Sequence, residues 1–275
     1  TGDVEVNIFA SGGTAPGGSA SRSGDINYLL DGSSHTGDLF FYSFGEGIGG
    51  VNSGDPGGQA NGGNQNLSII NGSSFTGDMT LATFRDSYYD TASSGALGDV
   101  DGGSFTLAID GSTVDIGVLD VSFSGGADTA AAGLAGANVA ATDFSLLVTG
   151  SQVTIGDASI ALDAVGGEGG LNARGGDGTG GAILITSDAS SSLALNDVTF
   201  ASSGTGGNGG LFGGTGGTGT GGAIGLFSLG DLDVGSLFAT AAGTGGMGGA
   251  GDTAESGGLG GDGQRELQVG AAGHA

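Results

Sequence analysis

The chain has no cysteine and no lysine, and each absence excludes a class of function. Without cysteine it can form neither a disulfide framework nor a thiol nucleophile. Four arginines stand against 29 acidic residues, which gives a net charge of −25. Nucleic acids and anionic lipids are recognised by clustered Lys and Arg, so we expect neither as a partner.

Tryptophan is also absent, and no apolar run reaches the length of a membrane span. We therefore expect no membrane insertion. Acid pairs such as Asp86 and Asp90, which flank Tyr88 and Tyr89, are the residue type that glycoside hydrolases use, but those enzymes also need aromatic and polar groups to hold the sugar. Lyase chemistry commonly needs Lys or Arg to stabilise an anion. The sequence predicts no enzyme activity.

Glycine, by contrast, accounts for 68 residues. Because each interior glycine costs a helix about 1 kcal/mol relative to alanine, we expect almost no helix. Gly-Asp pairs recur at a spacing of about 35 to 40 residues, which predicts about seven repeats. Gly and Asp are typical of corners between strands. The predicted repeat corners are Gly37, Asp38, Gly77, Asp78, Gly156 and Asp157.

Each repeat contains two runs of alternating apolar and polar residues separated by a turn. In one of the clearest copies, residues 144–148 form the first run, 149–151 the turn and 153–162 the second run. This alternation, rich in β-branched residues, predicts strands. Strands too short to bury a face alone gain a core by stacking on the copies above and below. The predicted fold is all-β, a parallel β-helix (β-solenoid) of about seven coils.

The third part of each repeat is rich in glycine and approaches a Gly-Gly-X pattern at 166–181, 204–222 and 243–263. A triplet pattern suits a left-handed helix with three residues per turn. These excursions are therefore predicted to pack side by side as polyglycine II helices. Flexible loops are the alternative.

We interpret residues 1–275 as a single β-solenoid repeat unit. Residues 1–164 form regular coils with mixed loops, and 165–263 form coils with long Gly-Gly-X tracts. Residues 264–275 form a strand that continues into a next unit. A start at Thr1 without methionine is expected of a mature or excised segment.

The two ends of the chain read as halves of one repeat. Residues 267–275 followed by 1–4 align with 29–39 and with 69–79. An unfinished repeat at each end predicts head-to-tail continuation. The partner is then another copy, either a separate subunit or the next repeat of a longer chain. The predicted junction consists of Val4, Val6, Leu267 and Val269.

Two acidic segments are candidate cation sites. Residues 257–264 match a Gly-Gly-x-Gly-x-Asp calcium repeat as far as Asp262, but Gln264 replaces the apolar residue that should follow. Asp99 and Asp101 have the carboxylate spacing of a calcium loop, although a solvated acidic turn is the alternative. Calcium is the one candidate cofactor, with Asp99, Asp101 and Asp262 as its candidate ligands.

Three segments carry a resemblance to a known family: GGAILI at 180–185, NDVTF at 196–200 and TGGAI at 220–224. They resemble coil signatures of the filamentous-haemagglutinin and autotransporter-passenger β-helices of Gram-negative bacteria. The resemblance covers most of residues 25–240. It implies a secreted, extracellular protein of the bacterial cell surface, an adhesin or biofilm-matrix fibre. A second resemblance, to phage tail-fibre adhesins with packed polyglycine helices, depends on the glycine tracts.

Together these features predict a structural extracellular fibre or adhesin shaft. Such a shaft would stack head to tail into a long acidic filament and attach to a surface or matrix. The alternative is a glycan- or receptor-binding adhesin module, in which the protruding residues Leu211, Phe212 and Met247 contact the ligand.

Overall fold

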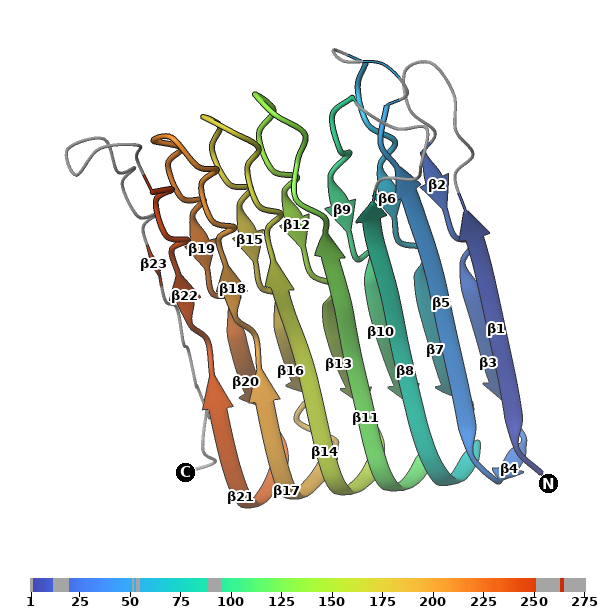
Figure 1. Cartoon of the computed structure of the whole chain (residues 1–275). Helices are drawn as coiled ribbons and strands as arrows, with labels where there is room; N and C mark the ends of the chain where they lie inside the picture. The colour runs from blue at the N-terminus through green and yellow to red at the C-terminus, as the bar shows by residue number, and fades with distance from the viewer. Residues whose placement is uncertain are drawn as a thin grey trace.

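The protein is an all-β solenoid. The computed structural model describes residues 2–11, 20–50, 52, 55–88 and 95–250, together with the backbone of 263–264. Those residues form 23 strands in three parallel sheets that wind around one axis (Figure 1). The predicted parallel β-helix is thus confirmed. Within the described residues there is no helix with the length and apolar character that a membrane crossing requires.

Three sheets form the walls of the solenoid. The long sheet consists of β1 (Val4–Ser11), β4 (Ser34–Thr36), β5 (Leu39–Ile48), β8 (Ser74–Tyr88), β11 (Thr113–Ala127), β14 (Gln152–Val165), β17 (Ser192–Ala201), β18 (Gly204–Thr205), β21 (Asp231–Thr240) and β22 (Gly243–Thr244). The six-stranded sheet consists of β3 (Ile26–Asp31), β7 (Asn64–Ile70), β10 (Ser104–Asp110), β13 (Asp143–Thr149), β16 (Ile183–Ser187) and β20 (Ile224–Ser228). The short-strand sheet consists of β2 (Ser21–Arg22), β6 (Ala60–Asn61), β9 (Val100–Asp101), β12 (Val139–Ala140), β15 (Gly178–Thr179), β19 (Gly219–Thr220) and β23 (Gly263–Gln264).

The described chain makes about six turns, whereas the sequence predicted about seven. The main path of the long sheet has seven strands, from β1 to β21, but the six-stranded sheet has one strand per complete turn. The sequence prediction counts the recurring Gly-Asp corners, and such a corner stands at both ends of the stack. Seven corners enclose only six turns, which explains the difference.

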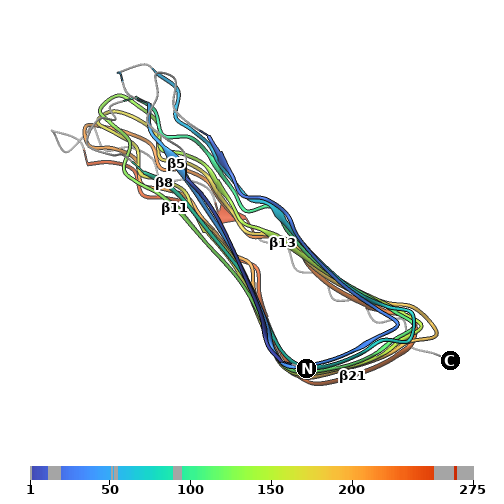
Figure 2. The same cartoon turned by 90° about the vertical axis from the view of Figure 1, so that its right-hand side faces the viewer.

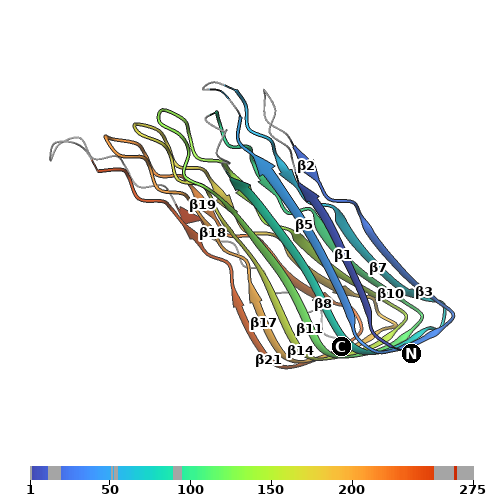
Figure 3. The same cartoon turned by 45° about the vertical axis from the view of Figure 1, so that its right-hand side comes forward.

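Every turn follows the same path. From β13 the chain passes a corner at Gly150, where φ is +55°, and enters β14. It then leaves the coil in a glycine-rich excursion and returns through β15 to β16. In a view along the axis the turns superpose into a wedge, and its narrow end carries the excursions (Figure 2). Figure 3 shows that the excursions all project from the same side of the stack.

The core consists of rows of equivalent side chains. Because side chains alternate between the two faces of a strand, one residue in two points inward, as in β10. Equivalent strands pair in register, so inward residues stack along the axis and exclude water. Full burial of each such side chain stabilises the fold by roughly 1.5–3 kcal/mol. One row contains Phe41, Leu81, Val121, Ile160 and Phe200, all buried.

The excursions pack through hydrogen bonds with a period of three residues. Gly166 and Gly169 donate their N–H groups to carbonyl oxygens of the next excursion, each at 2.9 Å. Gly167 and Gly170 donate in the opposite direction, to the preceding excursion, also at 2.9 Å. The following excursion repeats this pattern at 206–210. This period matches the predicted polyglycine II packing.

Glycine is required in this layer because backbones approach one another directly. A Cβ atom added at Gly207 would overlap the carbonyl oxygen of Gly167 in the preceding excursion. The Gly207 N–H donates to Gly176 O at 2.8 Å, and the Gly207 carbonyl accepts from Gly217 N–H at 2.8 Å. Any side chain would therefore push apart segments that hold each other through their peptide groups.

We predict that Gly207→Ala destabilises the protein by about 1–3 kcal/mol, the usual cost of overpacking a tight interior. The matched control is Gly24→Ala, where the nearest atom to the new Cβ lies at 4.0 Å. The control should be neutral or stabilising by up to about 1 kcal/mol, because alanine restricts the unfolded chain. Urea unfolding monitored by circular dichroism measures both. Equal stability of the two variants would contradict a packed glycine layer.

Candidate functional site

The predicted repeat corners form a row of linked carboxylates. Asp38 donates its N–H to Asp3 Oδ1 at 3.0 Å, and Asp78 donates its own to Asp38 Oδ1 at 2.8 Å. Val118 continues the row by donating to Asp78 Oδ1 at 2.8 Å. Asp157 occupies the next position, opposite Asp197. Asp3, Asp38 and Asp78 therefore each tie one turn to the next.

The corner glycines allow this close stacking. Gly37 has a φ of +138°, and a Cβ there would lie 2.5 Å from Gly2 O. A Cβ at Gly77 would overlap Gly37 O, and one at Gly156 would lie 2.5 Å from Gly117 O. The corner glycines thus let the turns approach closely, and the carboxylates of Asp38 and Asp78 accept backbone N–H groups of the adjacent turn.

Of the predicted junction, Val4 and Val6 lie on β1, while Leu267 and Val269 lie outside the described residues. In the register, Val4 is opposite Leu39 and Val6 is opposite Phe41. Leu39 and Phe41 are buried, whereas Val4 and Val6 are only half-buried. Within the described chain β1 pairs with β5 alone. Along residues 4–10 no described strand pairs with its other edge, which lies beside a partly covered core.

The two described residues of the predicted calcium site have backbone partners. Asp99 Oδ1 accepts the N–H of Asn138 at 2.9 Å, and Asp101 Oδ1 accepts that of Gly103 at 3.0 Å. In the described ranges no three His, Cys, Asp or Glu residues gather closely enough to hold a metal ion. Asp262 lies outside those ranges, so calcium binding stays a prediction.

The residues proposed to contact a ligand at the glycine-rich tips are solvent-exposed. Leu211 and Phe212 lie at the outer turn of one excursion, and Phe212 has a φ of +67°. Met247 lies in the following excursion and is the most exposed of the three, at 70%. Leu211 also lines a groove together with residues such as Glu168 and Asn208, and ligand binding there stays a prediction.

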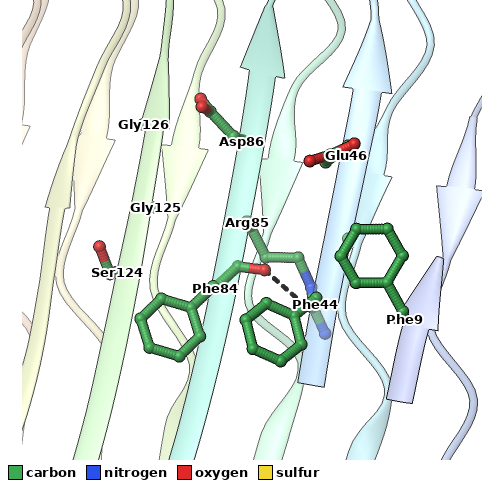
Figure 4. A pocket seen from close by; sticks show the side chains of 10 residues that line it. Phe9, Phe44, Glu46, Phe84, Arg85, Asp86, Ser124, Gly125 and Gly126 are labelled. Carbon is green, nitrogen blue, oxygen red and sulfur yellow. Dashed lines mark hydrogen bonds between the residues drawn. The ribbon is translucent and has the colours of Figure 1, made fainter. Parts of the chain in front are cut away.

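The sequence analysis missed an aromatic row on the outer face of the long sheet. Phe9, Phe44 and Phe84 occupy equivalent positions of β1, β5 and β8 (Figure 4). The ring centroids of Phe44 and Phe84 lie 5.1 Å apart with an interplanar angle of 11°, and those of Phe9 and Phe44 lie 5.8 Å apart. Phe9 is 67% exposed and Phe84 38%. Such contacts stabilise turn-to-turn stacking by about 0.5–1.5 kcal/mol per pair.

Two carboxylates flank this aromatic row. Glu46 and Asp86 are direct cross-strand partners and, with the rings and the backbone at Gly125 and Gly126, line a groove of about 380 Å³ (Figure 4). Partial loss of water, followed by the neighbouring charges of Asp128 and Glu46, raises the pKa of Asp86. The signal that finds this groove is the repeat offset itself. Phe84 and Asp86 stand 40 residues after Phe44 and Glu46, but only the register shows which residues face outward.

Behind the groove lies a buried arginine. Arg85 is 2% exposed and points inward between Gly45 and Gly125 of the neighbouring turns. Its guanidinium donates to the Ser43 and Phe84 carbonyls at 2.7 Å, and to the Ser23 and Ser43 hydroxyls at 2.6 Å. Burial lowers the pKa of Arg85 to about 10, although Asp101 opposes the shift. The arginine therefore stays charged at neutral pH and links three turns.

Comparisons of the chain with protein-family models, with curated proteins and with solved structures found no match. The resemblance to the filamentous-haemagglutinin and autotransporter-passenger β-helices therefore stays a prediction from the sequence.

Arg85 should contribute to stability mainly by filling space. Arg85→Ala leaves a cavity and is expected to cost about 2–5 kcal/mol. Arg85→Met should cost less, because the methionine fills much of the volume and no charge remains buried. Arg174→Met is the control, since that arginine lies on the surface in an ion pair with Asp177. If the methionine variant unfolds as easily as the alanine variant in urea, the hydrogen bonds matter more than the packing.

Asp86 should make stability depend on pH. Its pKa in the folded state lies above the ordinary value, so ionisation of this carboxyl opposes folding. Asp86→Asn should therefore raise the free energy of unfolding at pH 7, by no more than about 1 kcal/mol for an exposed charge. The gain should vanish below the ordinary carboxyl pKa, where both states are protonated. Thermal unfolding between pH 3 and 7, with Asp115→Asn as an exposed control, measures it. A gain that persists at pH 3 would contradict this cause.

Proposed function

We propose that the protein is a non-enzymatic structural shaft that stacks end to end with further copies of itself into a long acidic filament. The observation that carries this proposal is the free edge of β1. Strand β1 pairs in parallel with β5 on one side, and along its residues 4–10 no described strand pairs with the other side. An exposed edge of this kind is a template for pairing with another chain.

The internal structure defines what would dock on that edge. Turns within the chain stack by parallel pairing in register, and the free edge of β1 offers the same backbone pattern as β5 or β8. The half-buried Val4, Val6 and Ile8 continue the inward rows of β5. A further turn placed there would complete their burial, which is worth roughly 1.5–3 kcal/mol for each fully buried apolar side chain.

The opposite end offers the complementary surface. In the described chain β21 pairs with β17 only. The paired positions from β1 to β21 define each inward row of side chains. The row that begins at Val4 ends at Leu237, and the row that begins at Val6 ends at Ala239. Leu237 is 38% exposed. A copy added at this end would thus place Val4 over Leu237 and Val6 over Ala239.

The acidic surface fits a filament whose association is controlled by ions. With a net charge of −25, copies repel one another at low ionic strength. Salt screens this repulsion over about 8–10 Å, while the buried edge contacts keep their strength. Calcium is a candidate counter-ion for the same reason. This balance keeps an edge-exposing β protein dispersed until ions are supplied.

The remaining parts of the proposal depend on the sequence. Scarce cationic residues argue against nucleic acid as a partner. The family resemblance supports a secreted, extracellular location at a bacterial cell surface, with attachment to a surface or matrix as the role. A second candidate function is glycan or receptor binding by Leu211, Phe212 and Met247, which the exposure of these side chains favours.

We expect the protein to form linear assemblies as sodium chloride is raised, and Val6→Lys to abolish them. The lysine would place a charge inside the new interface, where it has no partner. Asn7→Lys is the matched control, because residue 7 adds the same charge on the outward face of β1. Sedimentation velocity and negative-stain electron microscopy measure the assemblies.

A fusion of two copies in tandem covers the case in which the neighbours are covalent. If the ends fit together, the fusion should unfold at a higher temperature than one copy, because stability accumulates with stacked turns. A protein that stays monomeric at every salt concentration, and whose fusion is no more stable than the single copy, would overturn the proposal.

A further inference from the structure

We propose that the groove on the outer face of β5 and β8 binds a small organic cation, an alkylated ammonium group, between the aromatic row and the two carboxylates. The site is defined by Phe9, Phe44 and Phe84 on one side and by Glu46 and Asp86 on the other (Figure 4). It lies on the outer face of the sheet, and Phe9 alone among these residues belongs to β1, the strand whose edge the filament proposal uses.

The aromatic row supplies an apolar surface that attracts cations. Aromatic faces are electron-rich, and a cation within about 6 Å of the ring centroid is attracted to them. Alkylated ammonium groups suit such rings because methyl groups spread the charge and lower the cost of losing water. The three rings are partly exposed rather than covered by other side chains, so the surface is open to a ligand.

The carboxylates supply a negative charge that no described cationic residue neutralises on this face. Glu46 and Asp86 are opposed across the strands, an arrangement that destabilises a sheet when both are charged. The only cationic residue lining the groove is Arg85, and its guanidinium is turned into the core, where it binds Ser23 and Ser43. Burial first, and then repulsion from Asp128 and Glu46, raises the pKa of Asp86, and a bound cation would relieve that repulsion.

The lining chemistry favours a cation over a sugar or an anion. Glu46 and Asp86 only accept hydrogen bonds when ionised, and Ser124 is the one lining side chain outside the core that can donate. A sugar hydroxyl network needs donors as well as acceptors, and an anion needs positive charge. The volume of about 380 Å³ lies at the low end for ligand sites, which fits a small group.

The groove ends where the aromatic row ends. In β11, Ser124 follows Phe84 in register, and Gly126 follows Asp86. A Cβ at Gly126 would meet no atom closer than Asp86 Oδ1 at 3.9 Å. The absence of bulk at these positions leaves one side of the groove open, so that a ligand can approach both the Phe84 ring and the Asp86 carboxylate.

The test compares choline with 3,3-dimethylbutan-1-ol, its neutral isostere, by NMR titration of the whole chain at low salt. Choline should shift resonances of β5 and β8 saturably, and the alcohol should bind at least tenfold more weakly. Phe44→Ala should weaken choline binding about two- to thirty-fold, the range that corresponds to cation–π attraction. Asp86→Asn should weaken choline binding as well. Added salt should make the difference between this variant and the unchanged protein smaller, because it screens the carboxylate charge.

Controls separate this site from general effects. Phe238→Ala removes an exposed ring from the same face of the long sheet, 65% exposed and far along the stack, and should leave binding unchanged. Phe44→Trp should preserve or improve binding, which distinguishes recognition from a folding defect. Equal binding of the alcohol would show a merely apolar groove. Complete displacement of choline by an equal concentration of calcium would show a plain counter-ion site, and either result would overturn the proposal.

Discussion

The structure depends on one constraint: each turn must place its backbone in parallel register on the next, about 4.8 Å away. Side-chain rows, corner glycines and the polyglycine layer all follow from it, because any residue is repeated at the same point of the neighbouring turn. Hydrogen bonds along the axis therefore join residues that are far apart in the sequence, 35 positions in the pair Asp3 with Asp38 and 44 in the pair Arg174 with Thr218. A side chain that breaks the spacing at one turn affects both of its neighbours.

The same constraint explains how so acidic a chain folds. Several carboxylates accept a backbone N–H from the adjacent turn, as Asp38, Asp163 and Asp177 do. At one corner, hydrogen bonds from Ser191, Gly150 and Ser190 lower the pKa of Asp188 to about 2. Aspartate is thus a connecting residue in this fold as well as a source of solubility. Because each link needs a following turn, a further turn added to the stack would form the same links, which fits the proposed growth end to end.

The repeating features could be predicted from the sequence because they are periodic. The alternation of apolar and polar residues predicts the strands, the Gly-Asp pairs predict the corners, and the Gly-Gly-X triplets predict a packed layer. The sequence alone could not show that Phe9, Phe44 and Phe84 occupy equivalent positions. The repeat length is 35 residues in the first turn and 40 in the next. A fixed period misaligns them, and only the paired register shows that they share the outer face. Arg85 was equally hidden, since an isolated arginine in a charged sequence reads as a surface residue.

Among the described residues, the buried side-chain polar atoms that have no hydrogen-bond partner lie in the early turns, and this asymmetry has a physical cost. Six buried side-chain atoms have no hydrogen-bond partner among the described residues, on Ser21, His35, Gln65, Thr83, Arg85 and Ser87. Unpaired buried polar groups each cost about 1–3 kcal/mol, and the later turns fill the same rows with apolar residues such as Phe123 and Leu162. A solenoid used only as a uniform spacer has no reason to differ between its halves. Departures from a locally consistent design concentrate at functional sites. Three of these residues, Thr83, Arg85 and Ser87, belong to β8, which carries part of the aromatic groove, and this supports the early turns as the place to test the proposed recognition.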